Sequence, residues 1–304
     1  MLSAYTGALT GELAALGAAA LWACTPLAIE GAARRIGSLT VNLVRLLFAF
    51  GFLCLAGWLS RGLPLPVDAT PHAWAWLTVS GLVGFTFGDL CLYRAFVVLG
   101  SRLSTLMMSL VPPLAALIGW LALGETLTPR DLLGMTLTIG GIAWAVLERT
   151  RPKVGASAGL HVTPAGLALG FGGALGQAAG LILSKIGMGS YNAFAAGQIR
   201  VLAGIAGYSL LFLVIGWWPN VRQGVRDRTA LGFSALGAFL GPFLAVTLSL
   251  IAIRTTVAGV AASIMALSPV LIIPLVILLR GEKVGIGGLL GALVAVSGVA
   301  LLFL

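Results

Sequence analysis

The chain has 304 residues, of which 59% are hydrophobic and only 9% charged, and its mean hydropathy is +1.07. A soluble domain carries about 25% charged residues, so this composition excludes a soluble globular protein. The net charge of +9 would suggest a nucleic-acid partner in a soluble protein, but the basic residues are scattered between apolar runs, and we expect none.

Apolar runs bounded by charged or turn residues predict an all-α integral membrane fold with ten transmembrane helices, since one crossing takes roughly 20 apolar residues. The spans are expected near 12–33, 40–60, 73–96, 102–124, 130–148, 164–186, 191–216, 230–253, 255–279 and 284–304. The first run lacks a basic flank, which favours a retained span over a cleaved signal.

An internal repeat relates the two halves of the chain, and an offset of 157 residues aligns them. The matching pairs include Gly84 with Gly241, Ala95 with Ala252, Met108 with Met265, Pro112 with Pro269, Glu125 with Glu282, and, with a gap of two, Arg45 with Arg200. We place the first repeat at 1–150, a connecting loop at 151–163 and the second repeat at 164–304. Each repeat holds five spans, an odd number, so the repeats are predicted to be inverted, as in secondary transporters.

Lysines and arginines predict the orientation, because they gather in cytoplasmic connections. The odd-numbered connections hold twelve: Arg34, Arg35, Arg94, Arg102, Arg149, Arg151, Lys153, Arg222, Arg226, Arg228, Arg280 and Lys283. The termini and even-numbered connections hold four: Arg61, Arg130, Lys185 and Arg254. Both termini are therefore predicted outside the cytoplasm.

Several segments resemble the EamA-type proteins of the drug/metabolite transporter superfamily. They are 20–22 (Ala-Leu-Trp), Arg45, Gly88-Asp89 through Tyr93-Arg94-Ala95, Leu110-Val-Pro112, Leu123-Gly-Glu125, Leu267-Ser-Pro269 and Gly281-Glu282. The resemblance implies ten spans, a central cavity and export or exchange of amino acids, other small metabolites or toxic compounds across a prokaryotic-type plasma (inner) membrane. The second half departs from the first, since Gly176 stands opposite Trp22 and residues 244–250 contain no acid answering Asp89.

Three ionisable residues fall inside predicted spans, where a charge costs about 2.5–3.5 kcal/mol on insertion scales. Asp89 is interpreted either as a proton or cation site or as one half of a structural ion pair with Arg45 or Arg94. For Arg45 and Arg200, a buried structural role or a position near the membrane surface is favoured over substrate contact.

Aromatic and amide side chains are the other candidates for a cavity wall. Tyr93 shares a helical face with Asp89, four residues away. Trp22 lies near the middle of the first span, where packing is the commoner role of an aromatic ring. Gln177 and Gln198 are read equally as substrate contacts or as links between helices.

Five prolines lie inside predicted spans, where each removes a backbone donor and bends the helix. They are Pro26, Pro112, Pro242, Pro269 and Pro274. The matched Pro112 and Pro269 suggest hinges at corresponding depths in the two halves, and a static kink is the alternative.

Two glycine-glutamate pairs, Gly124-Glu125 and Gly281-Glu282, are predicted to form structural turns. Glycine supplies the turn conformation, and the glutamate accepts bonds from amides at the start of the next helix. Spans five and ten are rich in glycine, which is typical of a scaffold or dimer surface, so a monomer and a homodimer both stay open.

We predict a secondary carrier for a small molecule, with alternating access and with proton coupling as one option. A passive channel and an intramembrane enzyme are the alternatives. An enzyme is disfavoured because His72 and His161 lie in predicted connections without an acid cluster. The spacing of Cys24, Cys54 and Cys91 matches no metal motif, so we expect no metal and no cofactor.

Overall fold

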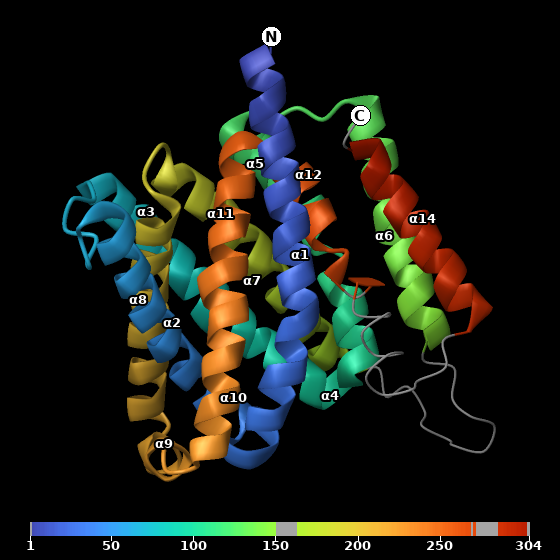
Figure 1. The fold of residues 1–304 in the computed structure, drawn as a ribbon. Coiled ribbons are helices and arrows are strands. Elements are labelled where there is room, and N and C mark those ends of the chain that lie inside the picture. The colour runs from blue at the N-terminus through green and yellow to red at the C-terminus, as the bar shows by residue number, and fades with distance from the viewer. Residues whose placement is uncertain (1, 150–162, 269, 272–284, 303–304) are drawn as a thin grey trace, which may run out of the picture.

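The computed structural model describes residues 2–149, 163–268, 270–271 and 285–302, and these residues form helices and turns without strands (Figure 1). The helices in chain order are α1 (Leu2–Ile36), α2 (Ser38–Arg61), α3 (Pro71–Gly81), η1 (Leu82–Gly88), α4 (Asp89–Met108), α5 (Val111–Leu123), α6 (Pro129–Arg149), α7 (Pro164–Met188), α8 (Ala193–Val214), α9 (Trp218–Gly224), α10 (Arg228–Ala238), η2 (Phe239–Ala245), α11 (Val246–Thr255), α12 (Ala258–Met265) and α14 (Ile286–Leu302). The stretches η1 and η2 are π-helical. The prediction of an all-helical fold is confirmed.

Five helical stretches are long and apolar enough to cross a membrane, which makes the chain an integral membrane protein. They are Ser38–Arg61, Pro71–Ala95, Pro164–Met188, Ala193–Val214 and Arg228–Thr255. Leu9–Thr25, Val111–Leu123 and Ile286–Leu302 are shorter apolar helices. The total of ten crossings stays a prediction.

Side-chain caps and glycines mark where several helices begin and end. The hydroxyls of Thr70 and Thr163 accept backbone N–H groups at the starts of α3 and α7, each just before a proline in the first helical position. Gly62 and Gly124 end α2 and α5 in the left-handed conformation, with φ of 71° and 66°, which glycine adopts without strain.

The predicted boundary between the third and fourth spans was wrong. Helix α4 continues without a break through 97–101 and ends at Met108, and α5 begins only at Val111. Pro112 therefore lies in the first turn of α5, where its missing N–H would have no partner in the helix. It does not bend the middle of a span. Its predicted counterpart, Pro269, lies outside the described residues.

The two repeats share an uncommon feature of their backbones. The π-helical stretches at 82–88 and 239–245 coincide under the same offset of 157 that aligns the sequences. The packing is also reciprocal. Helix α7 contacts α3, η1 and α4 of the first half, while α1 contacts α10, η2 and α11 of the second. Each half thus completes the packing of the other.

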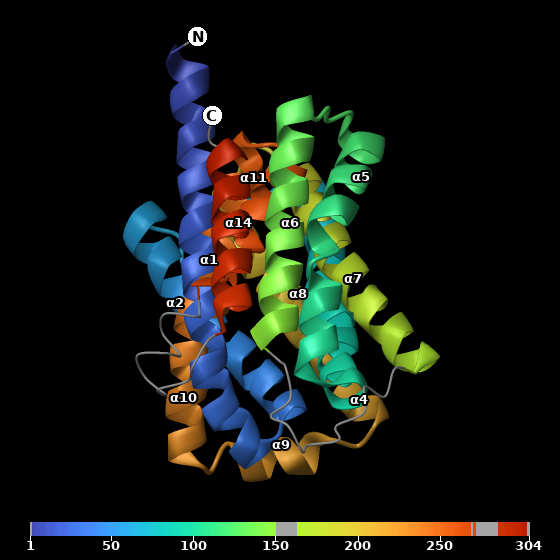
Figure 2. The ribbon, with the colours of Figure 1, turned by 90° about the vertical axis from the view of Figure 1, so that its right-hand side faces the viewer.

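Helices α6 and α14 form an antiparallel pair at one edge of the bundle (Figure 2). A β-carbon on Gly141 would lie 2.3 Å from the backbone nitrogen of Ala295, and one on Gly298 would lie 2.5 Å from that of Thr138. Gly298 and Ala295 are the counterparts of Gly141 and Thr138 under the offset. The same contact therefore occurs twice, as in a two-fold symmetric interface.

We expect Gly141→Ala to lower the melting temperature of the purified protein in detergent. The new methyl group would meet the backbone of α14, which cannot move aside as a flexible side chain can, and such overpacking costs about 1–3 kcal/mol. Gly140→Ala is the matched control, because nothing lies within 4 Å of a β-carbon there. Equal melting temperatures for the two variants would contradict the close α6–α14 contact.

Candidate functional site

A buried ion pair lies between the two halves of the bundle. The guanidinium of Arg45 on α2 donates to a carboxylate oxygen of Asp89, the first residue of α4. The amide of Gln177 on α7 donates to the other carboxylate oxygen at 2.9 Å and to the carbonyl of Gly84 at 3.4 Å. Asp89 is therefore held by one residue from each repeat.

Glycines explain how α7 comes close enough to reach Asp89. A β-carbon on Gly176 would lie 2.7 Å from the α-carbon of Gly88, and one on Gly180 would lie 3.0 Å from that of Gly84. Helix α7 therefore packs against η1 backbone to backbone, which is possible only without side chains at these positions. Gln177, next to Gly176, is brought within hydrogen-bond distance of Asp89.

The pair stays in contact with solvent-accessible space although it lies inside the bundle. The side chains of Arg45 and Asp89 are each 10% exposed, whereas Gln198 and Tyr208 are fully buried. The ring of Tyr93 lies 5.9 Å from the Arg45 guanidinium carbon. Charge, residual exposure and a nearby tyrosine ring make this group the candidate site.

Arg200 lies on α8 and is 6% exposed. Its guanidinium carbon is 5.0 Å from the ring centroid of Phe85 on η1, a cation–π contact between the repeats. It does not share the acid of Arg45, because Asp89 bonds to Arg45 and Gln177. Of the candidate residues, the structure thus brings together Asp89, Arg45, Tyr93 and Gln177. Arg200 lies outside this group, against the ring of Phe85 on η1.

Two other candidates lie apart from this group. Gln198 donates to the carbonyl of Pro64 at 2.7 Å, so it ties α8 to the connection after α2. Trp22 on α1 is partly buried and packs against the apolar core. Helix α1 continues through position 26, and Pro242 lies inside η2. The candidates Pro274, Gly281 and Glu282 lie outside the described residues.

Glu125 connects the repeats instead of capping the helix that follows it. Its carboxylate accepts the backbone N–H of Ala258, at the start of α12, at 2.9 Å and pairs with Lys185 of α7 at 2.5 Å. The next helix, α6, is capped by Thr128 and Asp131, which bond to each other's backbone N–H groups. The expected role at a helix start is observed, but the helix belongs to the other repeat.

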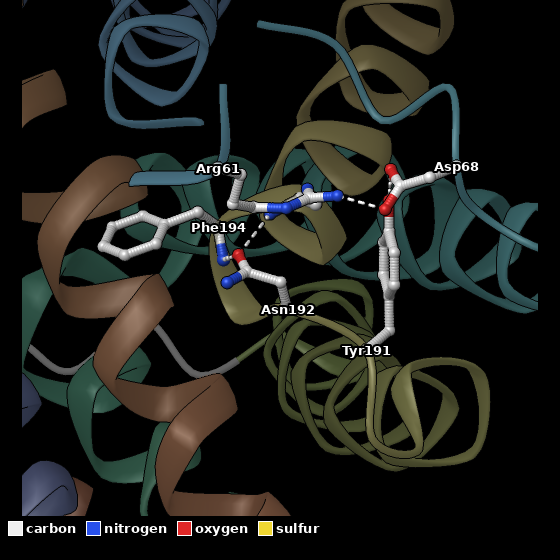
Figure 3. Close-up of polar contacts among 6 residues, drawn as sticks. Arg61, Asp68, Tyr191, Asn192 and Phe194 are labelled. Carbon is white, nitrogen blue, oxygen red and sulfur yellow. Dashed lines mark hydrogen bonds and ion pairs between the residues drawn. The ribbon is translucent and has the colours of Figure 1, made fainter. Parts of the chain in front are cut away.

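A second polar cluster joins the repeats (Figure 3), at the end of the bundle where α1 begins (Figure 1). Arg61, at the end of α2, pairs with Asp68, which also accepts the Tyr191 hydroxyl at 2.8 Å. Hydrogen bonds from Arg61 and then Tyr191 hold the pKa of Asp68 below its usual value of 3.8. Burial and the bond to Asp68 raise the pKa of Tyr191 to about 12.

Sequence reasoning did not single out Gly84, Phe85, Lys185 or the Arg61 cluster as functional. Gly84 carried a signal, since it matches Gly241 in the repeat. Lys185 and Arg61 were counted only as topology signals, although a charge near the end of a span can also reach across to the other half. Phe85 carried no signal beyond being aromatic.

These features define a class of protein, a helical membrane transporter built from two related halves. The chain belongs to the EamA-like transporter family, whose sequence pattern matches residues 9–147 and 164–304. Membership implies a small-molecule substrate and a lipid environment. A solved structure titled "Crystal structure of protein" has a TM-score of 0.73 at 18% identity and covers 96% of this chain and 95% of its own, which shows the fold. No curated protein matches.

We expect the difference in melting temperature between the wild type and Asp68→Asn to be constant from about pH 5 to pH 9 and to shrink below about pH 4. A lowered carboxyl pKa contributes stability that is present above the unfolded value and is lost as the pH falls through the folded value. The corresponding difference in the free energy of unfolding should be below about 1 kcal/mol, because Asp68 is 41% exposed. In Tyr191→Phe the loss should begin at a higher pH. A difference that grows toward acid would contradict the cluster.

Proposed function

We propose that this protein is a secondary carrier that moves a small metabolite, an amino acid or a related or toxic organic compound, by alternating access. The observation that carries the proposal is the Arg45–Asp89 ion pair, bonded by Gln177 of the other repeat and still in reach of solvent. Because Asp89 is bonded by residues of both halves, its hydrogen bonds change when the halves move relative to each other. Export or exchange, driven by a gradient, is the expected activity.

The proposed architecture is ten crossings in two inverted five-helix repeats, 1–150 and 164–304, joined by 151–163. The antiparallel α6–α14 pair and its reciprocal glycine contacts support inversion, since equivalent helices of the two repeats run in opposite directions. We place the protein in a prokaryotic-type inner membrane with both termini outside the cytoplasm, on the twelve-to-four distribution of basic residues.

Within the carrier, Asp89 is the proton or cation site and Arg45 its counter-ion. Gln177 and Tyr93 line the same polar region. The bond from Gln177 to Asp89 is made or broken when the second repeat moves relative to the first. Pro242 inside η2 is a hinge candidate, because a proline in a π-helical stretch leaves the backbone short of a donor. Trp22 is a wall residue that contacts substrate only if α1 turns inward.

Asp89→Asn should reduce pH-driven transport in proteoliposomes to background when the flux is normalised to folded protein, because the variant also leaves Arg45 without its counter-ion and lowers stability. The amide keeps the shape of the carboxyl group and its acceptor for Gln177, but it cannot take up a proton. The measurement is flux of radiolabelled substrate with and without an imposed pH difference. Unchanged pH-driven flux would remove Asp89 from the coupling step.

The double variant Arg45→Gln with Asp89→Asn separates coupling from a structural tie. Removing both charges avoids leaving one buried and unpaired, which by itself costs about 3–5 kcal/mol. If the pair only holds helices together, the double variant should regain both stability and pH-driven transport. We expect it to regain stability and to stay uncoupled.

A cysteine introduced at Thr10 and a label placed after Leu304 should react with a membrane-impermeant reagent in intact cells, in a background with the three native cysteines replaced. A cysteine at the exposed Asn220 of α9 should react only after the cells are opened. These outcomes are expected because the connection that contains α9 is rich in arginine, and such connections lie in the cytoplasm. Cytoplasmic labelling of both terminal positions would reverse the proposed orientation.

Counterflow distinguishes a carrier from a channel. Liposomes loaded with unlabelled substrate should transiently accumulate labelled substrate, because a carrier exchanges an internal substrate molecule for an external one at the same binding site. Flux that rises linearly with concentration and shows no such exchange would support the channel instead.

A further inference from the structure

Arg200 is a buried cation without an anion to match it. Its counterpart in the first repeat, Arg45, has Asp89. The position that answers Asp89 in the second repeat is occupied by Val246, which is buried and apolar. Among the described residues, no carboxylate or carbonyl accepts a hydrogen bond from the Arg200 guanidinium, and its Nε is buried without an acceptor.

The surroundings of Arg200 hold its guanidinium in place without neutralising it. Its guanidinium carbon lies 5.0 Å from the centroid of the Phe85 ring, and Nη2 lies beside Gly84, 3.4 Å from where a β-carbon would be. A side chain at Gly84 would cover this nitrogen. The contact with Phe85 orients the charge, but it supplies no hydrogen-bond acceptor.

The charges between the repeats sum to one positive unit. Arg45 and Arg200 contribute two positive charges and the paired Asp89 one negative charge, and Asp89 and Arg200 interact without an ion pair between them. An unpaired charge inside a membrane bundle is costly and is typically directed at a partner or a solute path. A monoanion would restore neutrality, whereas a phosphate monoester, with a charge of about −1.5 to −2, would exceed it.

We propose that Arg200 binds the carboxylate of a monoanionic substrate, with Phe85 orienting the guanidinium and Gly84 leaving Nη2 uncovered. The planar fork of arginine matches the two oxygens of a carboxylate, which accept two parallel hydrogen bonds. This inference rests on the proposed carrier function and adds to it the chemical class of the substrate. Neutral solutes and dianions are disfavoured.

The first experiment compares carboxylates with their neutral amides on the purified wild-type protein. Acetate and benzoate should raise the melting temperature in a concentration-dependent way at constant ionic strength, since a ligand of the folded state stabilises it. Acetamide and benzamide have the same shape without the charge and should not. If neither carboxylate shifts the melting temperature more than its amide, the proposal is wrong.

The second experiment assigns the effect to Arg200. Arg200→Gln should weaken carboxylate binding at least tenfold, as expected for loss of a charge-assisted bond, and Arg200→Lys should retain part of it. Arg222→Gln on α9 is the control, because it removes the same charge from an exposed position. Carboxylate binding that is unchanged in Arg200→Gln would assign Arg200 to packing on Phe85 alone. If Arg200→Gln does not fold, Arg200→Lys decides. A carboxylate affinity equal to that of the wild type would reject the proposed two-bond contact between the Arg200 guanidinium and the carboxylate.

Counterflow keeps this inference separate from the carrier proposal. Counterflow of a neutral solute together with no preference for carboxylates would leave the carrier standing and reject the role of Arg200. Carboxylate binding that is lost in Arg200→Gln, without counterflow of any bound compound, would support the anion site and reject the carrier.

Discussion

The Arg45–Asp89 ion pair is the contact around which the two halves are arranged. Charges within a membrane bundle have little water to solvate them, so they pair within the protein or face a solute path. Asp89 finds one in Arg45 of its own repeat and another in Gln177 of the other. The second partner is available only because glycines let α7 approach η1 at backbone distance. The glycines of α7 and η1 therefore determine which hydrogen bonds the Asp89 carboxylate can accept.

The two repeats are alike where they pack and differ at the acid that pairs with the buried arginine. The π-helical stretches and the α6–α14 glycine contacts occur in matched pairs. The surroundings of the two buried arginines do not, since Asp89 is answered by Val246 and Phe85 by Pro242, although Arg45 is answered by Arg200. A matched framework lets two halves of one chain fit together in two related ways. An unmatched interior makes the polar groups available from the two sides of the membrane chemically different.

Much of this could be predicted from the sequence, because the repeat offset and the apolar runs need only residue order. The helical fold and the family follow from such patterns, and an ion pair of Asp89 with an arginine was one of the two interpretations that they offered. The choice of Arg45 over Arg94 follows from helical spacing, since Arg94 lies five residues after Asp89 on α4 and therefore on another face, whereas the contact of α2 with α4 needs the fold. The π-helical stretches have no marker of their own in residue type, and only the match of Gly84 with Gly241 points to them.

The errors have a common physical cause, which is that sequence neighbours are easier to pair than distant residues. Pro112 was read as a bend within one long span, but the chain ends α4 at Met108 and starts a new helix there. Glu125 was assigned to the helix that follows it, but the start of α12 in the other repeat is closer. Both residues act at helix starts, and only the fold determines which helix start each one serves.

The contacts between the halves differ in how easily they can be exchanged for water. At the end where α1 begins, the halves are joined by the Arg61–Asp68–Tyr191 cluster and by Glu125 with Lys185, and at the other end by Arg35 with Asp227. The partly exposed pairs Arg61–Asp68 and Arg35–Asp227 contribute about 1 kcal/mol or less each, since water replaces them readily, whereas Glu125 and Lys185 are only 13% and 20% exposed. The glycine contacts lie between these ends, and in them backbone packs directly on backbone. Under the proposed mechanism, either end can therefore open while the glycine contacts act as the pivot.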